Sequence, residues 1–331
     1  FLPMWFVFAL ITTLSWGAAD LFYKKGADED DRYSHLKTAM MVGLVMGLHA
    51  ILTLIFGNIN YDPINLLVYF PVSLMYISSM VIGYFGLKYL ELSIASPIQN
   101  ASGAVAAILC LVFLRQIPDT LSIFGIILIC GGVFALGILE KKKDDEYLKE
   151  HDKKYKIGFV AFLMPLLYCV IDALGTFFDA FYLDDAASTP LKNVTEETLE
   201  DVANVSYELT FLICAVGIFI FMLIKKQKFF TRYQGSRLGA ATLETAGQFT
   251  YVKAMSGHGS VAAPMIGSYC IVSILLSRIF LKEKLSVWQY ITVAVVVGGI
   301  VLLGVAEGIS SSAEEAETLL AGIRTLCLSR A

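Results

Sequence analysis

The sequence has few charged residues and no cluster of side chains that commonly performs catalysis or holds a metal. Only 16% of its 331 residues are charged, whereas about 25% is usual in soluble domains. The six cysteines are spread singly, with no CxxC pair, and the four histidines are scattered. Such spacings predict neither a disulfide framework nor a zinc site. We therefore expect no catalytic residues, no metal and no cofactor, and we do not expect an enzyme.

Three further absences narrow the function. The phosphate-binding pattern GxxxxGK[ST] does not occur, which argues against direct drive by ATP. No basic tract with interleaved aromatic residues is present, so nucleic acid is not an expected partner. The first apolar block, 1–23, lacks the basic start and the small-residue cleavage site of a signal peptide, and we expect it to be a membrane span.

Apolar residues are abundant instead. They make up 57% of the chain, and the mean hydropathy is +0.69. They gather in blocks of about 20 residues, the helix length that crosses about 30 Å of hydrocarbon. Backbone groups in lipid must be satisfied within the segment, and the alternation of a membrane β-barrel is missing, so each block is predicted to be a helix. The ten predicted spans are 4–22, 38–56, 66–89, 94–114, 121–139, 157–181, 207–224, 238–255, 260–281 and 287–305.

Basic residues are concentrated in the loops that follow the odd-numbered spans. The opposite loops hold only Arg115, Lys192 and Lys253. Lysine and arginine near span ends mark the cytoplasmic face. We therefore expect a protein of the plasma (inner) membrane with its basic loops in the cytoplasm and both termini outside. The basic side chains on the first side are Lys24, Lys25, Arg32, Lys37, Lys141, Lys142, Lys143, Lys149, Lys153, Lys154, Lys156, Lys225, Lys226, Lys228, Arg232, Arg237, Lys282 and Lys284.

An internal repeat relates the two parts of the chain. At an offset of 167, the segment Phe113-Leu-Arg-Gln matches Phe280-Leu-Lys-Glu. An offset two residues shorter pairs Lys88 with Lys253, which lie at span ends, where long basic side chains are expected to have a structural role. The offset of 167 also places Pro97 on Pro264, Gly131-Gly132 on Gly298-Gly299 and Gly137 on Gly304. We therefore predict a duplicated module.

The repeat defines the expected domains. Two five-helix repeats, 4–139 and 157–305, are joined by a basic cytoplasmic linker, 140–156. A polar tail, 306–331, follows, and its sequence leaves open whether it is native. Because five is odd, the second repeat enters the membrane in the opposite sense, and such inverted repeats place a site near the midplane. The predicted fold is an all-α membrane protein with ten transmembrane helices in two inverted repeats.

Short motifs in both halves carry a resemblance to a known family. They are Ala263-Pro264, Phe280-Leu-Lys-Glu283-Lys, Gln289 and Gly298-Gly299 in the second half, and Ser15-Trp16-Gly17, Ala95-Ser-Pro97 and Gly131-Gly132 in the first. With these motifs, the segment 251–304 resembles the second repeat of the EamA-type branch of the drug/metabolite transporter superfamily. The resemblance implies ten helices and transport of metabolites or drugs, but it implies no particular substrate. The chain departs from it at Gln116, where the family often has an acidic residue.

Two acids fall deep inside predicted spans. Asp172 and Thr176 share one helix face, and Glu244, Gln248 and Tyr251 share another. An ionisable residue inside a membrane usually faces the bundle interior and marks a functional site. The alternative is a protonated acid that is hydrogen-bonded to a neighbouring helix. We expect these five residues to bind substrate or to carry a coupling proton.

Asp20 is a further candidate. It aligns with Asp172 at an offset of 152, as Trp16 aligns with Tyr168. Alternatively, Asp20 is an interfacial acid paired with the adjacent lysines, Lys24 and Lys25. Asp179 follows Asp172 on the same face, but it is a weaker candidate because its place near the span end lets it reach the interface.

Aromatic and amide side chains complete the expected site. With the carboxylates, aromatic rings could form a cage for an organic cation, although core packing is the common role of such rings. Asn100, with Gln99 and Ser102, follows Pro97 and could line the same cavity. Pro97 and Pro264 are expected to set helix geometry, and Gly43-xxx-Gly47 allows close helix approach and a possible homodimer. The candidate rings are Trp16, Tyr84, Tyr168, Tyr251 and Tyr269.

These expectations combine into one functional hypothesis and one rival. The hypothesis is a secondary transporter that moves a small polar metabolite or an organic cation across the bilayer by alternating access, with a proton as a candidate coupling ion. The rival is a membrane receptor or assembly protein that binds a ligand without transport. The partners expected are the small-molecule substrate and the lipid bilayer.

Overall fold

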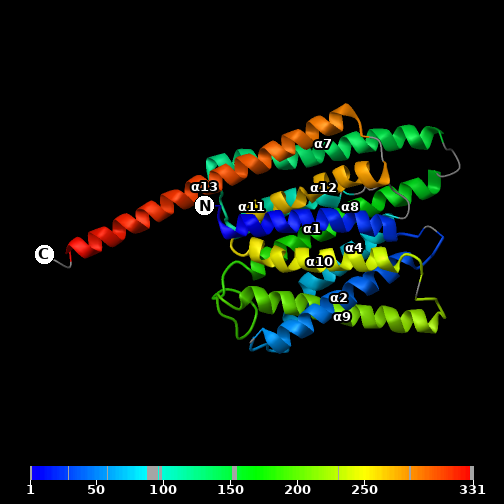
Figure 1. Ribbon diagram of the computed structural model, residues 1–331, viewed down its shortest axis with the longest axis horizontal. Coiled ribbons are helices and arrows are strands. Elements are labelled where there is room, and N and C mark those ends of the chain that lie inside the picture. Colours follow the sequence, from blue (N-terminus) through cyan, green and yellow to red (C-terminus); the bar gives the residue numbers. More distant parts are fainter. Residues whose placement is uncertain are drawn as a thin grey trace.

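The computed structural model describes residues 2–28, 30–57, 59–87, 96, 99–150, 155–229, 231–282 and 285–328. Within these ranges every regular element is a helix, and Figure 1 shows the helices packed into one elongated bundle. Large apolar side chains such as Leu48, Phe134 and Val301 are exposed on its surface. In water such a surface would be unfavourable, whereas it suits contact with lipid.

The first half contains five spans in the described ranges. Its third span is interrupted at Tyr69, and its fourth ends in a π-helical turn, η1. The fifth, α7, continues to Glu150, so most of the predicted linker 140–156 is helical. The elements are α1 (Met4–Gly26), α2 (Ser34–Phe56), α3 (Ile64–Val68), α4 (Phe70–Gly86), α6 (Ser102–Leu109), η1 (Cys110–Leu114) and α7 (Thr120–Glu150).

The second half repeats this plan. Its fourth span is built from two helices and a π-helical turn, η3. The last helix runs through the predicted tail to Leu328 and projects beyond the bundle in Figure 1. The elements are α8 (Tyr155–Tyr182), α9 (Leu199–Ile224), α10 (Gln234–Met255), α11 (Gly259–Gly267), α12 (Tyr269–Leu276), η3 (Ser277–Leu281) and α13 (Val287–Leu328).

Length and composition support membrane insertion. Six helical segments in the described ranges are long and apolar enough to cross a bilayer, and shorter apolar helices include Phe70–Gly86, Ser102–Leu114 and Thr120–Leu136. The remaining span, α10, has 22 residues but a polar face that carries Glu244 and Gln248. Both side chains are buried among the other helices, so the polar face of α10 does not contact lipid.

The backbone conformation of the two repeats matches at positions where their side chains differ. Span four turns at Ala101 and span nine breaks at Ser268, which the offset of 167 relates. The same offset superposes the π-helical turns η1 and η3. It also relates Arg115, with φ 56°, to Lys282, with φ 59°, two non-glycine residues in the left-handed region. Both repeats therefore end their fourth span with the same uncommon local geometry.

Helix packing follows the same two-fold relation. The helix α1 packs on α10 and α8 packs on α4, while α2 pairs with α9 and α7 with α13. Exchange of the two halves leaves this pattern unchanged. In Figure 1 the loop 183–198, which follows α8, lies at the same end as the start of α1, so α1 and α8 run in opposite directions. The prediction of two inverted five-helix repeats is confirmed.

The Gly43-xxx-Gly47 motif brings α2 close to α9 of the same chain. A Cβ added at Gly43 would lie 2.8 Å from the Ala215 Cβ, and one at Gly47 would lie 2.6 Å from the Leu212 Cβ. Contacts this short leave no space for a side chain. The motif therefore serves the joint between the two halves and presents no face to a second copy.

This packing predicts that Gly43→Ala lowers the free energy of unfolding by about 1–3 kcal/mol, because overpacking forces the helices apart. Thermal unfolding of the purified protein in detergent measures the change. Gly217→Ala in α9 is the control, since a Cβ there meets nothing within 4 Å, and it should be neutral or stabilising by about 0.5–1 kcal/mol. A Gly43→Ala protein as stable as the control would contradict the prediction.

Candidate functional site

A cavity lies between the two halves. Helices from both repeats form its wall, chiefly α1 and α4 from the first and α8, α10 and α12 from the second. The lining residues are Trp16, Asp20, Tyr23, Tyr76, Met80, Gly83, Tyr84, Leu87, Gln99, Tyr168, Asp172, Thr176, Tyr207, Glu244, Gln248, Tyr251 and Tyr269. All the candidate binding and coupling residues from the sequence are among them except Asn100.

Two aspartates occupy repeat-related positions in the wall, and each accepts two serine hydroxyls. Asp172 accepts from the Ser102 Oγ at 2.7 Å and from the Ser79 Oγ at 3.3 Å. Asp20 accepts from the Ser96 Oγ at 2.7 Å and from the Ser273 Oγ at 2.6 Å. These hydroxyls replace part of the water that a carboxylate loses on burial.

The second alternative for Asp20, pairing with the adjacent lysines, is not what the structure shows. Asp20 is only 9% exposed and its bonds go to serines. The Lys24 Nζ donates to the Leu87 carbonyl oxygen at 2.9 Å, and the Lys25 Nζ lies 5.1 Å from the centre of the Phe280 ring. Among the described residues, neither lysine forms an ion pair with this carboxylate.

Glu244 is the third carboxylate, and unlike Asp172 it has no acidic counterpart in the first half. Its Oε2 accepts a hydrogen bond from the Tyr23 hydroxyl at 3.1 Å. Its backbone oxygen accepts from the Trp16 Nε1 at 3.3 Å, and the Trp16 ring lies against Gly247, where a Cβ would collide with it. The offset that pairs Lys88 with Lys253 relates Glu244 to Ser79, so the first half carries a hydroxyl at this place.

Aromatic rings surround the carboxylates. The Trp16 ring lies 5.0 Å from Tyr251 and 5.8 Å from Tyr269, and Tyr23 lies 4.6 Å from Tyr84. Ring faces carry negative potential and attract cations. Among the lining residues that the structure describes, three are acidic and none is lysine, arginine or histidine. The described lining therefore offers acidic and aromatic groups and no basic side chain.

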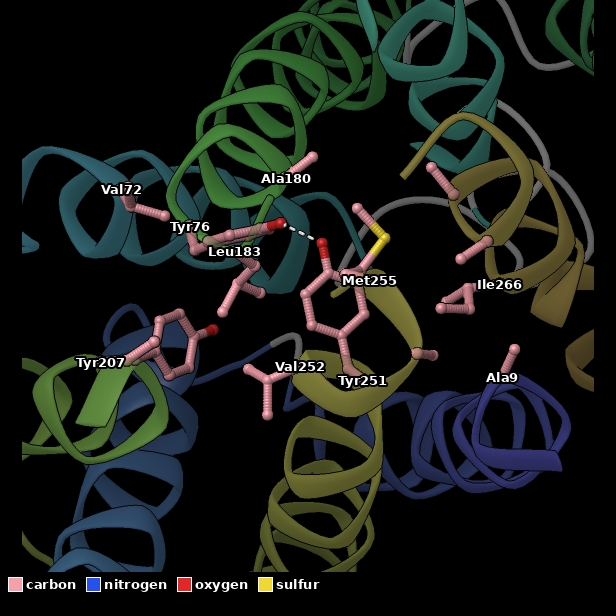
Figure 2. Close-up of a cluster of buried hydrophobic side chains, with 14 of the residues drawn as sticks. Ala9, Val72, Tyr76, Ala180, Leu183, Tyr207, Tyr251, Val252, Met255 and Ile266 are labelled. Carbon is pink, nitrogen blue, oxygen red and sulfur yellow. Dashed lines mark hydrogen bonds between the residues drawn. The ribbon is translucent and has the colours of Figure 1, made fainter. Parts of the chain in front are cut away.

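Hydroxyl contacts and apolar packing close the cavity at the end of the 183–198 loop. The Tyr251 hydroxyl lies 2.6 Å from the Tyr76 hydroxyl, which donates to the Thr176 Oγ1 at 3.1 Å. Figure 2 shows this tyrosine pair within a cluster of buried side chains. Beyond the pair the cluster includes Val72, Ala180, Leu183, Val252 and Met255. This packing separates the cavity from the adjacent end of the bundle.

The sequence grouped some lining residues correctly and missed others. Asn100 lies behind the wall and donates to the Ser96 backbone oxygen at 2.8 Å, so it supports a partner of Asp20. Among the grouped neighbours, Gln99 lines the cavity and Ser102 binds Asp172. The residues missed are Tyr23, Tyr76, Met80, Gly83, Leu87 and Tyr207. On predominantly apolar helices, a tyrosine or methionine looks like core packing.

Other candidates lie away from the cavity. Pro264 lies inside α11, ahead of the break at Ser268. Lys253 forms ion pairs with Glu200 at 3.2 Å and with Asp201 at 3.5 Å, in line with a structural role. Pro97 and Lys88 lie outside the described residues.

Asp179 does not reach the membrane interface as expected. Its side chain is 1% exposed and accepts a hydrogen bond from the Tyr69 hydroxyl. The expectation of an interfacial position is therefore wrong, because the end of α8 is covered by packed side chains such as Leu183.

Comparison with known proteins identifies the family. The profile of the EamA-like transporter family matches residues 3–138 and 205–305, and the second match begins after α8. A solved structure described as "Crystal structure of protein" aligns with a TM-score of 0.61 and 12% identity, over 90% of this chain and 95% of that one, a likeness that shows the fold alone. No curated protein matches the chain. The chain belongs to the EamA-like transporter family, a family of membrane transporters and not of enzymes.

Proposed function

We propose that this protein is a secondary transporter that moves a small organic cation or amine-bearing polar metabolite across the membrane by alternating access. The observation that carries the proposal is the cavity between the inverted halves, which holds three carboxylates and, in its described wall, no basic side chain. Inverted repeats with a central site are the arrangement on which alternating access depends. Family membership supports transport but leaves the substrate open.

The charge of the cavity favours a cationic substrate. An anion would meet Asp20, Asp172 and Glu244 in a site of low dielectric, where like charges repel strongly. A protonated amine would instead pair with a carboxylate and lie against the faces of Trp16 and Tyr251. The carboxylate and the aromatic faces together would replace the water that the cation loses when it enters the cavity.

The opposite pole of the substrate has a suitable partner in Gln99. This residue is 6% exposed, lines the cavity, and its Nε2 has no hydrogen-bond partner in the described structure. A buried amide donor without a partner is costly, so it suits a substrate that brings an acceptor. A hydroxyl or carbonyl oxygen on the amine-bearing molecule would satisfy it.

Asp172 and Glu244 are the groups that would bind the amine or carry a coupling proton. Burial disfavours an ionised carboxylate that has no cation beside it. Occupation by a proton and occupation by an amine therefore become alternatives at the same oxygens, and this competition is the physical basis for exchange of one for the other across the membrane.

The charges at the loop ends support one orientation. The helices α1, α9 and η3, which the basic loops follow in the sequence, all end at the end of the bundle opposite the 183–198 loop (Figure 1). By the positive-inside rule, this arrangement supports a cytoplasmic position for the basic end, with both chain termini outside. A receptor without transport is the rival function, and only a flux assay separates the two.

The first prediction of the proposal concerns affinity. A panel of amines, amino acids, sugars and nucleosides, screened by thermal shift, should give its largest stabilisation with an amine. Glu244→Gln should weaken binding of that amine by roughly tenfold to a hundredfold, the loss expected for one charged hydrogen bond. Titration calorimetry measures it, with Glu197→Gln in the exposed loop as control. Equal affinity in wild type and Glu244→Gln would remove Glu244 from the site.

The second prediction concerns coupling. Asp172→Asn keeps the size and shape of the side chain but cannot take up a proton as a carboxylate does. In proteoliposomes, uptake of the amine by the wild-type protein should increase with an imposed pH gradient, and the variant should lose that increase although it still folds. Undiminished response to the gradient in the variant would reject the role of Asp172.

The third prediction concerns orientation. In a cysteine-free background, Glu197→Cys should react with a membrane-impermeant maleimide on intact cells, whereas Lys228→Cys should react only after permeabilisation. Labelling in the reverse order would show that the basic loops face outward.

A further inference from the structure

A fourth acid, Asp179, is buried outside the cavity. It lies on the same face of α8 as Asp172 and Thr176, and its side chain is 1% exposed. The Tyr69 hydroxyl donates to its Oδ1, and its Oδ2 is buried without a close hydrogen bond, with the Tyr251 hydroxyl as its nearby polar group. Burial of an incompletely hydrogen-bonded carboxyl group inside a membrane costs free energy. Ionisable groups at such positions commonly take part in proton relays.

Among the described residues, no basic side chain forms an ion pair with Asp179. The helices α6 and α11, which pack near α8, contain no titratable residue. The titratable groups that interact with it from neighbouring elements are Tyr69 before α4, Tyr207 in α9 and Tyr251 in α10. Tyr76 in α4 contacts Tyr251, and η1, which carries Cys110, also packs on α8.

Hydroxyl groups lie between Asp179 and the cavity. Thr176 is on α8 between Asp172 and Asp179, and it accepts from the Tyr76 hydroxyl at 3.1 Å. The Tyr251 hydroxyl contacts Tyr76 at 2.6 Å, as the dashed line in Figure 2 shows. The Tyr251 hydroxyl also faces the Asp179 carboxyl group, and Tyr76 lies near Asp172. A hydroxyl can accept one proton on its oxygen and release its own. The three hydroxyls therefore lie between the two acids in an order that suits proton transfer.

We propose that Asp179 is a proton-loading site that exchanges protons between the end of the bundle near the 183–198 loop and Asp172 in the cavity. The inference rests on the proposed proton-coupled transport. When that end is open, a proton from water adds to the Asp179 carboxylate. The hydroxyls of Tyr251, Tyr76 and Thr176 each take up a proton and release one, Asp172 gains a proton, and Asp179 returns to its ionised form. Only O–H bonds form and break.

The experiment separates proton movement from amine movement. Full-length protein is reconstituted in liposomes that contain a pH-sensitive dye, and the amine that binds best in the screen is the probe. Amine-evoked proton flux is measured beside amine counterflow without a pH gradient. Asp179→Asn should reduce the proton flux at least tenfold, while counterflow and amine affinity remain within about twofold of wild type. Asp185→Asn, in the exposed loop at the same end, should leave both signals unchanged.

Other outcomes overturn the proposal in distinguishable ways. Wild-type proton flux in Asp179→Asn would remove Asp179 from the route and leave the transporter proposal intact. Joint loss of counterflow, amine binding and proton flux would assign Asp179 a structural or substrate-binding role. Amine transport by the wild type without any proton movement would refute proton coupling itself.

Two further variants keep the test decisive if Asp179→Asn fails to fold. Asp179→Glu retains an ionisable carboxyl group and should restore proton flux. Tyr69→Phe removes the donor to Oδ1, and the pH at which proton flux is half-maximal should move by a measurable amount. An unchanged pH profile in Tyr69→Phe, together with no flux in Asp179→Glu, would overturn the proposal.

Discussion

The cost of carboxylates inside a membrane governs how this bundle is arranged. A charged side chain at the bilayer centre costs about 2.5–3.5 kcal/mol on insertion scales. The chain places three acids at the seam between its halves and brings serine or tyrosine hydroxyls to each of them. The donors come from α1, α4, α6 and α12, and Ser96 adds another. Satisfying these acids thus requires both repeats to be in place.

The duplication explains where those donors can lie. The fourth span of each repeat turns or breaks at related positions, Ala101 and Ser268, and ends in a π-helical turn followed by a left-handed residue. The break lies just before Ser273, which donates to Asp20, and the turn lies just before Ser102, which donates to Asp172. The uncommon backbone geometry and the polar contacts therefore belong to the same part of each repeat.

Sequence alone predicted the spans, their inversion and much of the wall. Blocks of apolar residues determine where helices cross, and polar stripes such as Asp172–Thr176 stand out against them. The breaks within the spans were not predictable, because Ala101 and Ser268 carry no signal in hydropathy. Tyr23, Tyr76 and Tyr207 were missed because a tyrosine in an apolar helix has the same pattern whether it packs or lines a cavity.

Asp179 shows a different limit of sequence analysis. Its distance along α8 from the span end suggested contact with water, but depth depends on what covers a helix. Leu183, Leu191 and Leu199 from the following segment are all buried, and Asn65 holds that segment through two hydrogen bonds with Lys192, of 2.7 and 2.9 Å. This acidic segment therefore also packs leucine side chains against the bundle. Its mean hydropathy does not reveal them, because the acidic residues dominate the average.

Glu244 has a consequence for direction. If both modules were identical, the substrate would meet the same electrostatic surroundings whichever compartment the protein faced. Here Ser79 stands where the twin module has Glu244, so the two-fold relation between the halves is broken by one carboxyl group. Under the proposed alternating access, a cation would therefore be bound with unequal affinity in the two states, and import and export would differ.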